Sequence, residues 1–162
     1  MRAYPSASNC GFSLIELIIV LTLMMIVGSV AYMAWPNDDF NVSAQAESLA
    51  SDIRYAQSLS TAKNERYRVD FTNPSQYQIL DSTGTAIVIP AVNATTVTFP
   101  TGITQTSVIN YLVFDTHGTP YSSTTSNGSG TVLTGNLIIV VSGTLGTKQI
   151  LVESETGGVF VQ

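Results

Sequence analysis

The stretch Gly11-Phe12-Ser13-Leu14-Ile15-Glu16-Leu17 decides the interpretation of this chain, because it places one carboxylate at the start of a long apolar run. Glu16 is the only charged side chain between Arg2 and Asp38. At about 1.5 Å per helical residue, the segment from Phe12 to Trp35 is long enough to span a bilayer. An unpaired charge at mid-membrane costs about 2.5 to 3.5 kcal/mol, and less near an end, so Glu16 is a candidate functional residue.

Two interpretations of this segment leave Glu16 without a role. A secretory signal peptide is favoured by the small residues Ser29-Val30-Ala31, but the apolar run is too long for one and the preceding region carries only Arg2. An uncleaved single-pass anchor fits the length equally well. A third interpretation comes from a family resemblance.

Gly11-Phe12-Ser13-Leu14-Ile15-Glu16-Leu17 and the apolar run resemble the class III signal of type IV pilins and type II secretion pseudopilins. The resemblance implies that a prepilin peptidase/methyltransferase cuts between Gly11 and Phe12 and methylates the new N-terminus at Phe12. The positions before the Gly, which are often basic in this family, are Ser8-Asn9-Cys10 here. The implied partners are other pilins or pseudopilins in a filament.

Cleavage gives Glu16 a partner. The new amine of Phe12 is a cation four residues from the carboxylate, so the two groups can neutralise each other along one helix face or between neighbouring subunits. In related filaments the matching Glu pairs with the amine of an adjacent subunit, which makes Glu16 the predicted assembly residue. Packing of the apolar surface supplies the remaining contact.

Composition limits the other possibilities. The 162 residues suffice for one globular domain plus the helix, and six Lys and Arg stand against eleven Asp and Glu. This balance makes nucleic acid an unlikely partner. The only cysteine, Cys10, lies in the predicted leader, where no lipobox precedes it, so no disulfide is expected in the mature protein. Arg2 precedes the apolar run and the acidic bulk follows it, which predicts a single-pass inner-membrane protein with a cytoplasmic N-terminus and a periplasmic C-terminal domain.

Beyond the apolar run the pattern predicts a second helix. Pro36 indicates a break, with Asn37 to Asp39 available as a cap. From there, charged side chains are expected on the solvent faces of the helix, and apolar residues recur at steps of three and four. The apolar stripe is Val42, Ala46, Leu49, Ile53, Ala56 and Leu59, and the solvent-facing charges are Glu47, Asp52, Arg54 and Lys63.

After Asn64 the apolar period changes from helical to two, and strand-forming Thr, Val, Ile and Tyr dominate. We therefore predict an α+β fold in which the long N-terminal helix packs on one face of a C-terminal antiparallel β domain. The expected boundaries are a leader over 1–11, an assembly helix over 12–36, an amphipathic helix over 40–64 and a β-rich domain over 65–162. Strands are expected at 66–71, 76–80, 86–89, 95–99, 109–114, 137–142, 149–153 and 159–162.

The same organisation narrows the resemblance. Residues 50–63 followed by Arg66-Tyr67-Arg68-Val69-Asp70-Phe71 resemble the H-type minor pseudopilins of type II secretion and the FimT-like minor pilins that share their domain, as do residues 113–120 and 149–161. FimT-like pilins that bind DNA carry an arginine-rich C-terminus. This chain closes with Glu153 and Glu155, which favours a minor pseudopilin and leaves a minor pilin of pilus biogenesis, adhesion or DNA uptake as the alternative. The basic residues Arg54, Lys63, Arg66 and Arg68 are expected to solvate the corner between helix and first strand.

Catalysis and metal binding find little support. His117 is the only histidine and lies beside Asp115 in a Gly-Pro turn, a pattern more typical of a turn than of a general base. No Cys and His cluster or phosphate loop occurs, and the acidic pair Asp38-Asp39 is explained by capping. We therefore expect no enzyme, cofactor or metal. Residues 122–130 are interpreted as a flexible solvated loop that contacts a partner or carries sugar only as a lesser alternative.

Overall fold

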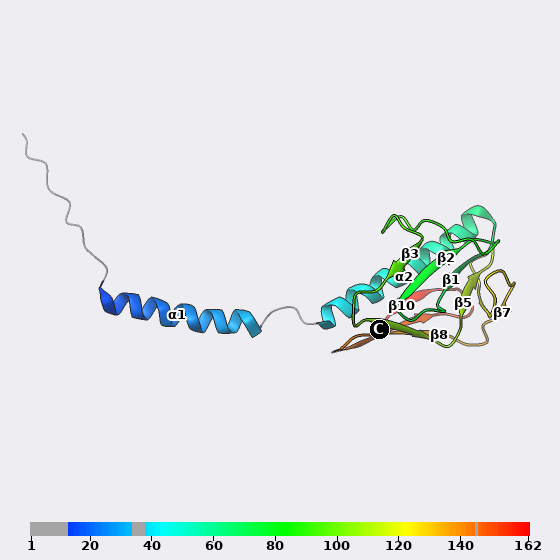
Figure 1. The fold of residues 1–162 in the computed structure, drawn as a ribbon. Helices are drawn as coiled ribbons and strands as arrows, with labels where there is room; N and C mark the ends of the chain where they lie inside the picture. Colours follow the sequence, from blue (N-terminus) through cyan, green and yellow to red (C-terminus); the bar gives the residue numbers. More distant parts are fainter. Residues whose placement is uncertain (1–12, 34–37, 145) are drawn as a thin grey trace, which may run out of the picture. The chain divides into compact units, whose positions relative to one another are not determined.

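The computed structural model describes residues 13–33, 38–144 and 146–162. The chain divides into two compact units, Met1–Pro36 and Asn37–Gln162. The first contains helix α1 (Leu14–Met33), and the second contains helix α2 (Asp38–Lys63) and all the described strands (Figure 1). Among the described residues, no helix combines the length and the apolar character that a membrane crossing requires.

Helix α2 starts two residues before the predicted position and ends in a defined cap. Asn64 has a φ of 54°, the left-handed conformation that ends a helix, and the Glu65 N–H donates to the Ser60 carbonyl at 3.2 Å. These two features form the Schellman arrangement, which satisfies a carbonyl of the last turn. The chain is thereby turned directly into β1.

The strands form two antiparallel sheets, whereas the sequence predicted a helix covering one sheet face. The first sheet has the order β3-β2-β1-β5-β6-β7, and the second has the order β10-β9-β8-β4. Helix α2 contacts β1 and β5 of the first sheet and β8, β9 and β10 of the second. The strands are β1 (Tyr67–Asp70), β2 (Gln76–Leu80), β3 (Thr96–Thr98), β4 (Thr104–Ser107), β5 (Tyr111–Phe114), β6 (Pro120–Ser123), β7 (Thr131–Val132), β8 (Leu137–Ser142), β9 (Thr147–Val152) and β10 (Val159–Val161).

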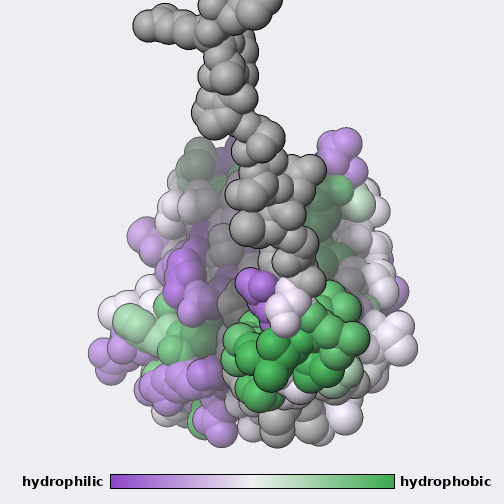
Figure 2. All heavy atoms as spheres, turned by 90° about the vertical axis from the view of Figure 1, so that its left-hand side faces the viewer, coloured by the Kyte–Doolittle hydropathy of each residue, from purple (hydrophilic) through white to green (hydrophobic). Residues whose placement is uncertain are grey.

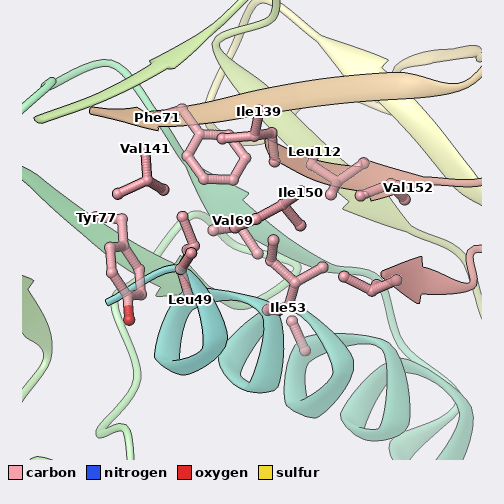
Figure 3. Packing of buried hydrophobic residues seen from close by; sticks show 14 of the residues in the cluster. Leu49, Ile53, Val69, Phe71, Tyr77, Leu112, Ile139, Val141, Ile150 and Val152 are labelled. Carbon is pink, nitrogen blue, oxygen red and sulfur yellow. The ribbon is translucent and has the colours of Figure 1, made fainter. Parts of the chain in front are cut away.

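One core lies between α2 and the two sheets. The predicted helix stripe is confirmed: its members from Val42 to Ala56 are at most 1% exposed, and Leu59 is partly buried against them. In Figure 3, Leu49 and Ile53 extend from α2 towards Val69 of the first sheet and Ile150 of the second. The α+β fold class is therefore confirmed, with the two sheets sharing one helix.

Seven of the eight predicted strands are confirmed, as β1, β2, β3, β5, β8, β9 and β10. The bounds of β2 and β8 match the prediction. The strand expected at 86–89 is wrong: this segment makes only isolated bridges, Leu80 with Ala86 and Ile89 with Ala94, because the chain turns back at Pro90, which has no N–H to donate. Three strands were not predicted from the sequence: β4 is polar, β6 starts with a proline, and β7 contains only two residues.

Candidate assembly site

Glu16 lies in the first turn of α1. The Ser13 carbonyl accepts hydrogen bonds from the N–H groups of Glu16 at 3.0 Å and Leu17 at 3.2 Å, which starts the helix. A carboxylate in this turn is also favoured by the partial positive charge of a helix N-terminus. The position thus stabilises α1 locally before any partner is considered.

The spacing of Ser13 and Glu16 also fits a capping box, in which the glutamate has a purely structural role. In that motif, the serine hydroxyl accepts from the N–H of the glutamate and the glutamate carboxylate accepts from the N–H of the serine. Neither side-chain hydrogen bond is formed within the described part of the chain. The Glu16 side chain is exposed and remains available to a partner.

Between Leu14 and Ser29, the side chains of α1 other than Glu16 are mostly apolar and exposed, and Figure 2 shows a cluster of green spheres there. Leu14 is 76% exposed, Leu21 49% and Val27 68%, so no face is covered within its own unit. Its described hydroxyl groups are satisfied internally, because Thr22 donates to the Ile18 carbonyl at 2.8 Å and Ser29 donates to that of Ile26 at 2.8 Å. An apolar helix surface that has no cover within its own unit is typical of a contact surface.

The predicted cleavage and N-methylation positions, Gly11 and Phe12, lie outside the described residues. The break expected at Pro36 also lies outside them. Among the site residues predicted from sequence, the structure therefore places Glu16.

The prediction that Asp52 lies on a solvent face of the second helix is wrong. Asp52 is 5% exposed, and its Oδ2 accepts a hydrogen bond from the Tyr77 hydroxyl at 2.6 Å. Burial raises the pKa of Asp52, although the hydrogen bond from Tyr77 favours the charged form. This polar pair joins α2 to β2 inside the domain.

Gln57, also on α2, joins the helix to one turn from each sheet. Its Nε2 donates to the Gly118 carbonyl at 2.9 Å, in the turn between β5 and β6, and to the Thr156 carbonyl at 3.0 Å, in the turn between β9 and β10. One amide therefore links three elements that are far apart in the sequence. The periodicity of α2 gave no signal for this role.

The predicted basic corner is solvated in part: Arg54 and Lys63 are exposed and Arg66 is half-buried, whereas Arg68 is buried. Arg68 is 1% exposed, on the sheet face opposite Val69, and its guanidinium donates to the Ser126 carbonyl and, at 3.4 Å, to the Ser82 carbonyl. Arg54 donates to the Val159 carbonyl at 2.7 Å. Both arginines hold loops or strand ends in place, and of the two only Arg54 is exposed.

The His117 region is a turn. The Asp115 Oδ1 accepts from the backbone N–H groups of His117 and Thr119, both at 2.9 Å, and the His117 side chain is 85% exposed. Burial opposes the charged form of Asp115, but the hydrogen bonds outweigh it and lower its pKa. No group of three or more His, Cys, Asp or Glu side chains within the described ranges could hold a metal ion.

Comparison with protein families gives two matches. Residues 6–32 match the prokaryotic N-terminal methylation motif, and residues 45–152, well over half of the chain, match the type II transport protein GspH. The chain belongs to the GspH family. The domain is thus that of pilins and pseudopilins, which are structural subunits anchored in membranes and built into pili or pseudopili.

Solved structures agree with this fold. The type IV minor pilin FimU of Pseudomonas aeruginosa strain PAO1 is 14% identical, with a TM-score of 0.54, covering 78% of this chain and 92% of FimU. The minor pseudopilin EpsH from the type 2 secretion system of Vibrio cholerae is 7% identical, with a TM-score of 0.52, covering 75% of this chain and 96% of EpsH. A comparison with curated protein sequences found no match. A type IV minor pilin and a minor pseudopilin therefore share the fold of this chain.

Proposed function

We propose that this GspH-family chain is a minor pseudopilin of a type II secretion pseudopilus. In this proposal a prepilin peptidase cuts between Gly11 and Phe12, and the mature subunit enters the filament through its N-terminal helix. The observation that carries the proposal is Glu16, one exposed carboxylate on a helix whose other described side chains are apolar or internally bonded.

Glu16 acts in this proposal as a selective joint. Its carboxylate pairs with the methylated amine of Phe12 from an adjacent subunit, so that two charges that are costly in an apolar setting neutralise each other. An apolar surface that is the same all round favours no particular register between helices. A single charge pair does favour one, because a shift along the helix by one turn, about 5.4 Å, separates the two charges.

The proposed location is the inner membrane, crossed once by residues 12–36. The N-terminus is cytoplasmic and the domain formed by residues 65–162 is periplasmic, an orientation that the single Arg2 before the apolar run supports. The domain adds no chemistry of its own. Its role is to present a folded surface on the filament. The shared hydrophobic core attaches the two sheets of this domain to α2.

The second candidate is a minor type IV pilin, the class of protein to which FimU, with the same fold, belongs. Within that candidate, pilus biogenesis or adhesion fits the surface better than DNA uptake. The chain closes with Glu153 and Glu155, and the most deeply placed arginine, Arg68, is 1% exposed.

Mass spectrometry of the protein extracted from its own membranes tests the processing step. We expect a chain that starts at Phe12 and carries one methyl group on the terminal amine. A chain that starts at Met1, or after Ala31 as a signal peptide predicts, contradicts the proposal.

Deletion of the gene separates the two candidates. A pseudopilin is required for secretion of folded proteins into the medium, whereas a minor pilin is required for surface pili. Loss of pili with normal secretion would favour the second candidate.

A further inference from the structure

A groove of about 550 Å³ lies at one end of the first sheet, where β5 begins and β6 ends. Its walls are Val108–Asn110, Ser122–Thr125 and Gly128–Thr131. The volume falls in the range of about 300 to 1,000 Å³ that is usual for ligand sites. The groove is distinct from Glu16 and belongs to the second compact unit.

The loop over residues 122–130 forms one wall, and its composition predicts a flexible segment. Two arginines nevertheless donate hydrogen bonds to its backbone. Arg68 donates to the Ser126 carbonyl, and Arg66 donates to the Ser129 carbonyl at 3.3 Å. The Arg66 guanidinium also lies 5.9 Å from the centre of the Tyr121 ring. The wall therefore has fixed anchor points, which lowers the entropy that a ligand must overcome.

A glycine is required in this wall. Gly130 has a φ of 77°, and a Cβ there would lie 2.7 Å from the Ser122 carbonyl oxygen. The close approach of the loop to β6, which shapes the groove, thus depends on the absence of a side chain.

The groove is uncharged, and so is the sequence around it. Between Asp81 and Lys148 the only Asp, Glu, Lys or Arg is Asp115, and none lines the groove. The side chains of Asn110, Thr124 and Ser129 make no hydrogen bond to any other residue that the structure describes. Val108 on the rim is 87% exposed. Depletion of charge with an exposed apolar residue is typical of the centre of a protein interface.

We propose that this groove binds an uncharged extended segment of a neighbouring filament subunit. Backbone amides and carbonyls of such a segment match the hydroxyl and amide groups of the walls, and Val108 supplies an apolar contact. A phosphate or carboxylate ligand finds no cation in the lining. The inference rests on the proposed function, because it takes its partner from the filament.

Cross-linking from inside the groove tests the proposal. In a Cys10→Ser background, Thr124→Cys is labelled with a thiol-reactive photo-cross-linker in filaments assembled by the native host, and adducts are identified by mass spectrometry. Val88→Cys, at a residue 53% exposed and outside the groove, is the matched control. We expect adducts with a peptide of another filament subunit, at least tenfold more abundant from position 124 than from position 88.

The other outcomes overturn the proposal. An adduct with a glycan would identify the groove as a carbohydrate site, and assembled filaments without an adduct would exclude a neighbour there. Because incorporation and adducts are measured separately, incorporation without an adduct counts against the groove alone. Failure of the chain to enter any filament counts against the proposed function and, with it, against the groove.

A charge on the rim gives a second test without risk to the core. Val108→Glu is expected to reduce filament incorporation at least fivefold while processing at Phe12 continues. Val88→Glu, the control, is expected to incorporate at the level of the unmodified chain. Equal incorporation of the two variants contradicts the proposal.

Discussion

Helix α1 and the domain formed by residues 37–162 differ in the exposure of their apolar side chains. In α1, Leu14 and Val27 are more than 60% exposed, and one carboxylate interrupts the apolar surface. In the domain, Leu49 and Ile53 are fully buried between α2 and two sheets. The domain therefore buries its own apolar side chains, whereas the apolar surface of α1 has no cover within its own unit.

A pair of truncations, one in each region, tests this difference with the largest expected effect. Ile53→Ala removes a fully buried side chain and should lower the free energy of unfolding of the domain by about 2 to 5 kcal/mol. Leu21→Ala, at a residue 49% exposed, should change it by less than about 0.5 kcal/mol. Urea denaturation of the full chain in detergent, followed by tyrosine fluorescence or circular dichroism, gives both values. Similar losses in the two variants would show that the domain draws stability from α1.

Sequence periodicity correctly predicted which apolar residues of the domain are buried. The stripe from Val42 to Ala56 and the alternating strands β2 and β8 follow directly from spacing, and Glu16 stood out because its surroundings lack charge. Hydrophobic burial depends on local pattern, which a single sequence displays.

The buried polar groups could not be predicted in the same way. Asp52, Arg68 and Gln105 are each at most 5% exposed, yet each belongs to a residue type that usually faces water. Tyr77, the partner of Asp52, is 25 residues away in the sequence, and Ser126, the partner of Arg68, is 58 residues away. Such pairing depends on the tertiary fold. Likewise β4 was missed because Gln105, its buried residue, is polar and donates to the Phe71 carbonyl at 3.0 Å.

The hydrogen bond between Tyr77 and Asp52 offers the next largest effect. Tyr77→Phe keeps the ring and removes the hydroxyl that donates to the buried carboxylate at 2.6 Å. We expect a loss of about 1.5 to 3 kcal/mol in the free energy of unfolding, because the buried acceptor is left without its donor. Tyr121→Phe, whose hydroxyl lies 3.4 Å from Asp115, serves as the control and should lose less. Equal losses would show that the buried hydrogen bond between Tyr77 and Asp52 contributes no more to stability than the one between Tyr121 and Asp115.

Gln57→Ala should have a smaller effect, spread over both sheets. It removes two hydrogen bonds, to the Gly118 and Thr156 carbonyls, and should cost about 1 to 2 kcal/mol. Hydrogen exchange should speed up in both turns together. Faster exchange in the turn between β5 and β6 alone would indicate that Gln57 does not couple the two sheets.

The smallest expected effect is the contribution of Asp52 to the pH dependence of stability. Because burial raises the folded-state pKa of Asp52, its folded form binds a proton more readily than its unfolded form, whose ordinary value is 3.8. Its contribution to stability therefore grows as the pH falls through the raised pKa and levels off below 3.8. The pKa values of Asp81 and Asp115 are lowered and act in the opposite direction. Asp52→Asn isolates the residue: the stability of the unmodified chain minus that of the variant should rise on acidification. A difference that stays constant with pH contradicts the assignment.

The central claim, that Glu16 is the joint through which α1 finds its partners, is tested most directly by filament incorporation of Glu16→Gln. The substitution keeps the size of the side chain and removes its charge, and Thr22→Val is the control because the Thr22 hydroxyl is already satisfied within the helix. We predict that both variants are processed at Phe12, that Thr22→Val incorporates normally, and that incorporation of Glu16→Gln falls tenfold or more, as expected for the loss of about 1.4 kcal/mol or more. Incorporation of Glu16→Gln at the level of the unmodified chain would contradict the account.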